Sequence, residues 1–183
     1  MTDYFALLDQ PRAPWLDPAV LKETFRRKSL EQHPDLARGA EGGEFAELNE
    51  AYQVLQNPKR RLHHLLSLEN RTPAANQALP SDLQELFLQI GALNQNVTPL
   101  LEKLRAASNP LTKSLLKADM VTAQKELGGL RDKVRELDAE AETRLRQTEA
   151  NRHEELSVLY QRFAYLSRWS AQLDELAGQL SEL

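Results

Sequence analysis

The chain has 183 residues, a formal net charge of −4 and no cysteine, and this length suits one domain or two small ones. The acidic balance argues against a nucleic-acid-binding protein, because such proteins use a strongly basic face. The absence of cysteine excludes a disulfide framework, a thiolate metal site and a cysteine nucleophile, and it suits a reducing compartment.

The N-terminal segment lacks a targeting pattern. Residues 1–5 show no basic region followed by an apolar core, as a signal peptide would. No apolar run reaches the roughly 18 residues that a membrane-spanning helix needs. We therefore expect a soluble, cytoplasmic protein that does not contact a membrane. A short helix is predicted around residues 4–8, and the prolines at 11 and 14 end it.

The second predicted helix has clear start and stop signals. Asp17 supplies an N-cap carboxylate, and Pro18 fits the first helical position. The helix should run to about Gln32, because Pro34 biases His33 away from helical geometry.

This second helix carries a local basic patch. Lys22 and Arg26 are one helical turn apart and share a face, and Arg27 and Lys28 follow directly. The patch stands immediately before the tripeptide at residues 33–35.

Two further helices are predicted before a polar boundary. An Asn57-Pro58 pair ends the third helix and starts the fourth, which runs to about Leu68. Residues 69–81 are polar with two prolines and mark the best boundary in the chain. The third helix has an apolar stripe at i, i+3 and i+4 spacing, formed by Phe45, Leu48, Ala51, Tyr52 and Leu55.

Beyond the boundary, apolar residues are spaced alternately three and four residues apart. This spacing places them in one apolar seam along a helix that packs lengthwise against a partner helix. Residues 146–155 suit a turn between two antiparallel helices, and a helix over about 81–107 would complete a three-helix bundle, with Pro99 a kink or break. An extended coiled-coil hairpin is the alternative, and either way the fold class is all-α. The two seams contain Leu127, Leu130, Val134, Leu137, Ala141 and Leu145, and Leu156, Leu159, Phe163, Leu166, Ser170, Leu173, Ala177 and Leu180.

No catalytic or metal constellation is indicated. A proline separates His33 from Asp35, and no suitable serine motif completes a triad. His63 and His64 are adjacent, so their side chains diverge by about 100° on a helix and do not converge on a metal. We expect no enzyme activity, no metal site and no cofactor.

Residues 3–68 resemble a J-domain, the DnaJ-type module that docks on DnaK-type 70-kDa heat-shock chaperones. The resemblance is carried by "DYFALL", "LKETFRRKSLEQHPD", "FAELNEAYQVLQNPKRR" and the HPD tripeptide. It implies an antiparallel helical hairpin flanked by short helices, and a co-chaperone that stimulates the partner's ATPase. The expected domains are a J-domain at 1–70, a linker at 71–81 and a C-terminal helical domain at 82–183.

The resemblance also implies roles for the chaperone-binding residues. The basic side chains of the second helix would approach an acidic chaperone surface and speed the encounter. Asp35 would pair with a cationic group of the partner, Pro34 would fix the backbone and His33 would hold the loop. The residues with these implied roles are Lys22, Arg26, Arg27, His33, Pro34 and Asp35.

Three positions depart from the J-domain pattern. Lys28, Gln32 and Leu36 stand where an apolar, an aromatic and a basic residue are usual. We expect Lys28 to bury its aliphatic stem and keep its ammonium in water.

"DYFALLDQP", "NPKRRLHHLLSLEN" and "ELSVLYQRFAYLSRWSAQLDELAGQL" resemble the HscB family of iron–sulfur cluster assembly co-chaperones. That likeness implies a C-terminal three-helix domain that binds the cluster scaffold protein, with no cluster on this chain. The implied client surface consists of Leu86, Phe87, Ile90 and Leu93, although bundle core is the simpler explanation of these four residues. The expected carboxylates are replaced by Gln89, Asn94, Gln95 and Asn96.

Two alternatives remain open at this point. The helical tail could bind a client outside iron–sulfur assembly, and the missing carboxylates keep this alternative open. The chain could also be a structural coiled-coil protein with an inactive J-like fold, which the intact HPD tripeptide argues against.

Overall fold

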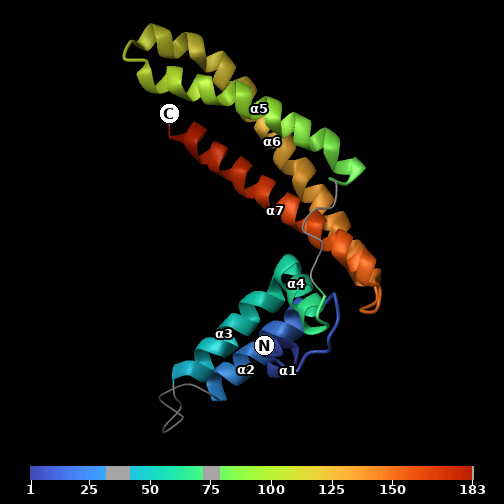
Figure 1. Ribbon diagram of the computed structural model, residues 1–183. Coiled ribbons are helices and arrows are strands. Elements are labelled where there is room, and N and C mark those ends of the chain that lie inside the picture. Colours follow the sequence, from blue (N-terminus) through green and yellow to red (C-terminus); the bar gives the residue numbers. More distant parts are fainter. Residues whose placement is uncertain (32–41, 72–78, 183) are drawn as a thin grey trace. The chain divides into compact units, whose positions relative to one another are not determined.

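The computed structural model describes residues 1–31, 42–71 and 79–182, and these ranges contain helices and no strand, as the all-α prediction requires (Figure 1). Contacts group the chain into two compact units, residues 1–76 with 141–163 and residues 77–140 with 164–183. The helices are α1 (Tyr4–Leu7), α2 (Pro18–Glu31), α3 (Gly42–Gln56), α4 (Pro58–Leu68), α5 (Ser81–Ala106), α6 (Pro110–Gln147) and α7 (His153–Ser181).

Side-chain caps fix where the early helices begin. The Asp3 carboxylate accepts hydrogen bonds from the backbone N–H groups of Phe5 and Ala6, at 3.0 and 3.3 Å. The Asp17 carboxylate accepts one from Ala19 N–H at 2.8 Å. These bonds satisfy N–H groups that have no partner within the helix, so α1 and α2 start where the sequence predicts.

The apolar stripe of α3 is only partly confirmed. Leu48, Ala51 and Leu55 are fully buried, and Tyr52 stacks on Phe25 of α2 with ring centroids 4.2 Å apart. Phe45 is 37% exposed, so its interpretation as a core residue is wrong. Periodicity identifies the buried face of a helix, but it does not say how far along the helix the neighbouring elements reach.

Both ends of α4 are defined by local hydrogen bonds. Asn57 accepts from Arg60 N–H at 3.0 Å through its side chain. At the other end Asn70 adopts a left-handed conformation with φ of 55°, and Arg71 N–H donates to the Leu66 carbonyl at 3.0 Å. This is a Schellman termination with asparagine in place of the usual glycine.

A buried arginine joins α4 to two other segments. Arg61 is 4% exposed, and its guanidinium donates to the Pro14 carbonyl at 2.7 Å and to the Leu55 carbonyl at 2.5 Å. Burial lowers the pKa of Arg61 to about 10, while Glu142 acts in the opposite direction. The guanidinium therefore remains charged at neutral pH and holds the connection before α2 and the end of α3 against α4.

The first unit has one continuous apolar core. Its buried residues come from α1 to α4, from the connection before α2 and from the facing ends of α6 and α7. They include Phe5, Leu8, Leu16, Leu21, Leu48, Leu55, Leu62, Leu65, Leu66, Leu145, Leu156, Leu159 and Phe163. The sequence placed all of 82–183 in one domain, whereas contacts group 141–163 with the N-terminal helices. The predicted linker at 71–81 stays a prediction.

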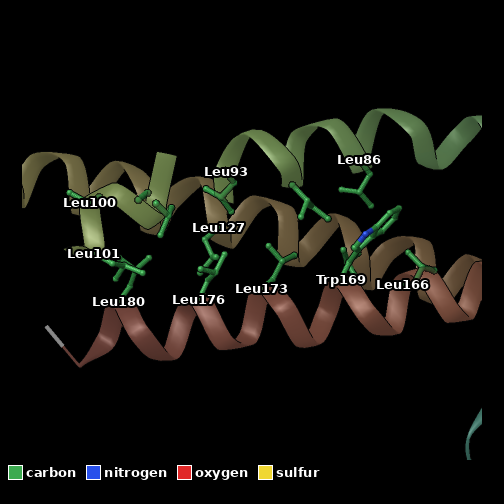
Figure 2. Close-up of a cluster of buried hydrophobic side chains, with 14 of the residues drawn as sticks. Leu86, Leu93, Leu100, Leu101, Leu127, Leu166, Trp169, Leu173, Leu176 and Leu180 are labelled. Atoms are coloured by element: carbon green, nitrogen blue, oxygen red, sulfur yellow. The ribbon is translucent and has the colours of Figure 1, made fainter. Parts of the chain in front are cut away.

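The second unit contains α5 and the remaining parts of α6 and α7 around a second core. Leucines from all three helices meet with Trp169 in this core (Figure 2), which is the three-helix arrangement rather than a two-helix hairpin. Pro99 lies inside an unbroken α5, so the helix continues through the expected break. The predicted turn after α6 is present, because α6 ends at Gln147 and α7 begins at His153.

His64 fixes the short α1 against α4. Its Nε2 accepts a hydrogen bond from Tyr4 N–H at 3.1 Å, and its ring stacks on Tyr4 and Phe5. Burial lowers the pKa of His64 below its usual value of 6.5. A neutral imidazole with its proton on Nδ1 is therefore the form that suits this site.

Acidification should weaken the first unit through His64. Because the folded-state pKa lies below the unfolded one, the stabilisation is complete above the unfolded pKa of 6.5 and is lost as pH falls toward the folded value. The unfolding free energy, measured in urea, should fall between about pH 7.5 and pH 5.5. One titrating group contributes at most about 1.4 kcal/mol per pH unit to this fall. His64→Gln should make the fall less steep, because it removes the titrating imidazole. His63, which is exposed, provides the control. If His63→Gln made the fall of the unfolding free energy with pH equally less steep, the role of His64 would be contradicted.

Candidate functional site

The basic side chains predicted on the second helix lie on the surface of α2. Lys22, Arg26 and Arg27 are all exposed. Arg27 is partly neutralised, because it pairs with Asp9 at 2.9 Å and with Glu31 at 3.1 Å. Within the described part of the chain, Lys22 and Arg26 make no ion pair, so they are the cations of this patch that α2 presents to a partner.

Asp9 is an anchor that sequence reasoning missed. It follows α1 in a left-handed conformation with φ of 50°, which aspartate tolerates better than most residues. Hydrogen bonds from Lys28 and Arg27 hold the pKa of Asp9 below its usual value. The Asp9 carboxylate therefore connects the end of α1 to the later turns of α2. In the sequence, the one feature that could have indicated this role is the position of Asp9 directly before Gln10-Pro11.

Lys28 shows how the polar departure from the J-domain pattern is accommodated. Its side chain is 20% exposed, so the aliphatic stem is largely buried as expected. The ammonium is not left to water alone, because it lies 2.9 Å from the Asp9 carboxylate. The pair therefore lets a lysine occupy a flank of α2 where an apolar residue was expected.

The tripeptide His33-Pro34-Asp35 lies outside the described residues. The described part of α2 ends at Glu31, and Lys22 and Arg26 therefore precede the tripeptide in the sequence by seven or more residues. The roles of the three tripeptide residues stay predictions.

The four residues expected on the client surface separate into two groups. Leu86, Ile90 and Leu93 are at most 3% exposed and belong to the three-helix core, and Figure 2 shows Leu86 and Leu93 pointing into it. Phe87 is 54% exposed, and its ring lies 6.5 Å from that of Trp169. Of the four, Phe87 alone offers its side chain to a partner.

A second apolar residue on α5 was not singled out from the sequence. Leu88 is 68% exposed beside Phe87. Gln95 and Asn96, about two turns further along α5, are also exposed and uncharged. Asp82 and Glu85, which precede Phe87 on α5, are exposed carboxylates. The exposed part of α5 therefore has acidic side chains before the apolar pair and uncharged ones after it, where the resemblance implies carboxylates.

Within residues 1–31, 42–71 and 79–182, no group of three or more histidine, aspartate or glutamate side chains could hold a metal ion. None of the helices in these ranges has the length and apolar character needed to cross a membrane.

Comparison with known proteins identifies the N-terminal part. A family model described as "DnaJ domain" matches residues 3–64. The chaperone protein DnaJ of Caulobacter vibrioides is 44% identical over 63 residues, which cover 33% of this chain and 16% of that protein. The J-type co-chaperone jac1, mitochondrial, of Schizosaccharomyces pombe is 30% identical over 93 residues, which cover 48% of this chain and 41% of that protein. The matches thus span less than half of these curated relatives.

A solved structure matches nearly the whole chain in fold. The chaperone HscB from Vibrio cholerae superposes with a TM-score of 0.57 at 21% identity, and the match covers 98% of this chain and 99% of that one. Residues 3–64 are a DnaJ domain. The chain as a whole has the fold of an HscB co-chaperone, a DnaJ domain joined to a helical C-terminal part.

Proposed function

We propose that this protein is a co-chaperone that stimulates the ATPase of a DnaK-type 70-kDa heat-shock chaperone and delivers an iron–sulfur cluster scaffold protein to it. The observation that carries the first half is the DnaJ domain match at residues 3–64, whose second helix exposes Lys22 and Arg26 ahead of His33-Pro34-Asp35. The HscB-like fold, and the family resemblance behind it, support the second half.

The exposed cations of α2 would act on the encounter with the chaperone. Two cations on one helix face that make no ion pair with a described residue would attract an acidic surface from a distance and set the orientation of docking. Asp35 would then pair with a cationic group of the partner, most simply an arginine, in a charge-assisted hydrogen bond. The chain itself performs no catalysis in this proposal, because the ATP site belongs to the chaperone.

The client surface would be centred on Phe87 and Leu88. Aromatic and apolar side chains that are half or more exposed lose water when a partner covers them, and such residues dominate binding energy. Leu86, Ile90 and Leu93 would contribute indirectly, because their burial in the core fixes the face of α5 that carries Phe87.

A second candidate keeps the chaperone partner and changes the client. Gln95 and Asn96 are exposed and uncharged on α5, whereas the exposed carboxylates Asp82 and Glu85 lie before Phe87. The part of the surface after Phe87 therefore favours a client with fewer basic groups there than a carboxylate-rich surface would bind. A cytoplasmic location belongs to both candidates, although the jac1 relative is named as mitochondrial.

The chaperone half is tested by steady-state ATP hydrolysis of the host's DnaK-type chaperones. Asp35→Asn should return the rate to that of the chaperone alone. Arg26→Glu should weaken chaperone binding by about tenfold, or about 1.4 kcal/mol, and make the residual binding less sensitive to salt. Arg26→Glu should not alter helicity or melting, because Arg26 is exposed, and a melting curve of Asp35→Asn shows whether that variant is folded.

The matched control for charge is Lys125→Glu, an exposed lysine on α6, which should leave the stimulation unchanged. Full stimulation by Asp35→Asn would refute the co-chaperone proposal. A normal response from Arg26→Glu would show that the basic patch is only a solvated helix face.

The client half is tested by the scaffold protein's binding and its effect on stimulation. Phe87→Ala should weaken scaffold binding by about tenfold or more while leaving the scaffold-independent ATPase stimulation intact. Leu111→Ala, which removes another strongly exposed side chain on α6, should leave both unchanged. If the wild-type protein stimulates the chaperone but ignores the scaffold, the second candidate replaces the first.

A further inference from the structure

The hairpin of α5 and α6 extends past the end of α7. Leu180, in the last turn of α7, packs in the core of the second unit near Leu101 of α5 (Figure 2). α5 continues to Ala106 and α6 begins at Pro110, so the turn of the hairpin lies beyond the described end of the third helix (Figure 1). We call residues 103–118 the hairpin tip. The side of the tip that α7 would cover therefore has no described helix against it.

Two leucines of the hairpin tip project into solvent. Leu111 is 67% exposed, and Leu115, one turn further along α6, is 71% exposed. The side of α6 that packs on its neighbours carries Leu116 instead, which is partly buried against the core of the second unit. Leu111 and Leu115 thus share a face of α6 that points away from this core. Their exposure is not explained by the packing of the three helices.

The hairpin tip is strongly basic, although the chain as a whole is acidic. Residues 103–118 contain four cationic residues and no aspartate or glutamate, whereas the net charge of the chain is −4. All four cations are exposed, and none of them makes an ion pair with a described residue. They are Lys103, Arg105, Lys113 and Lys117. The tip therefore surrounds its two leucines with positive potential, which an anionic surface complements.

Local hydrogen bonds fix the way in which the tip presents these side chains. Asn109 caps the start of α6, because its side-chain oxygen accepts from Leu111 N–H at 2.8 Å and its carbonyl accepts from Lys113 N–H at 3.1 Å. Only residues 107–109 connect the two helices. The leucines and the cations are thus held in place before a partner arrives, so that binding loses little conformational entropy.

The size and composition of the tip favour a lipid surface over a protein partner. A stable protein interface buries about 800 Å² and roughly 20 to 30 residues on each side, whereas the strongly exposed apolar part of the tip is two leucine side chains. Leucines bordered by lysine and arginine are typical of helices that lie at the boundary between the headgroups and acyl chains of a bilayer. Each cation near an anionic bilayer adds to the attraction.

We propose that the hairpin tip binds the surface of anionic phospholipid membranes. Leu111 and Leu115 would insert at the level of the headgroups, and the four cations would lie against the lipid phosphates. The contact is peripheral and reversible, because two leucines supply only a small apolar area. It departs from the expectation, drawn from the sequence, that the chain does not contact a membrane. The tip shares no residue with the basic patch on α2 or with Phe87 and Leu88, so the proposal does not depend on the co-chaperone function.

Vesicles are the probes, either of phosphatidylcholine alone or of an equimolar mixture of phosphatidylcholine and phosphatidylglycerol. In co-sedimentation, the full chain should bind the anionic vesicles and not the neutral ones, and added salt should weaken the binding. The double variant Lys113→Gln, Lys117→Gln should weaken it by about tenfold or more. The matched control on α2, Lys22→Gln with Arg26→Gln, removes two other exposed cations and should leave the binding unchanged.

The apolar part of the contact has its own pair of variants. Leu111→Ala with Leu115→Ala should weaken binding to the anionic vesicles by about fivefold or more, because less apolar surface then leaves water. Leu88→Ala, which removes a leucine of α5 that is 68% exposed, should leave it unchanged. A melting curve for each variant shows that it is folded.

Four results would overturn the assignment. The first is the absence of binding to the anionic vesicles. The second is an equal loss in the α2 control, which would place the contact on the basic patch of α2. The third is unchanged binding in the folded double leucine variant, because the attraction would then be charge alone. The fourth is tighter binding to soluble polyglutamate than to the anionic vesicles, with the same dependence on the two leucines, which would assign the tip to an acidic protein.

Discussion

The first unit depends on one buried charge, the guanidinium of Arg61. Burying an unpaired charge in a protein interior is strongly unfavourable, and here the carbonyls of Pro14 and Leu55 accept two hydrogen bonds from it. These carbonyls belong to the connection before α2 and to the end of α3, two segments far apart in the sequence. Arg61 therefore fixes both against α4, and its charge makes the arrangement specific rather than merely compact.

The position of the basic patch follows from this arrangement and from two polar contacts near α1. His64 holds the start of α1 through Tyr4 N–H, and Asp9 at the end of α1 holds Lys28 and Arg27 of α2. As a result Arg27 is partly neutralised, whereas Lys22 and Arg26 stay available. Residues 141–163 share the apolar core of this unit. The last turns of α6 and the first turns of α7 therefore stabilise the helices that carry the basic patch.

Much of the fold was predictable from local rules. The N-caps Asp17 and Asn57, each followed by proline, located the starts of α2 and α4, because the capping chemistry lies within a few residues. The all-α class and the turn after α6 followed from periodicity. Phe45 was misread, because the extent of burial along α3 is set by neighbours that no short pattern describes.

The site was less predictable than the fold. The side chains of Lys22 and Arg26 could be placed on one face from spacing alone. Periodicity alone could not separate Leu86, which is core, from Phe87, which is exposed. Asp9 meets Arg27 18 residues away, and Arg61 meets the Pro14 carbonyl 47 residues away in addition to that of Leu55. Nothing local in the sequence distinguishes these two residues from surface charges. The grouping of 141–163 with the N-terminal helices is likewise a tertiary contact between distant segments.

The most direct test of the role of Arg61 is the unfolding free energy of the first unit. The chain has two tryptophans, so a Trp169→Phe background leaves Trp15, half-buried in the first unit, as the fluorescent reporter of urea unfolding. In that background Arg61→Met should lose about 2 to 4 kcal/mol, because two buried carbonyls are left without donors. The neighbouring Arg60→Met, which removes only a surface pair with Glu50, should lose less than about 1 kcal/mol. An Arg61→Met protein as stable as its parent would contradict the account.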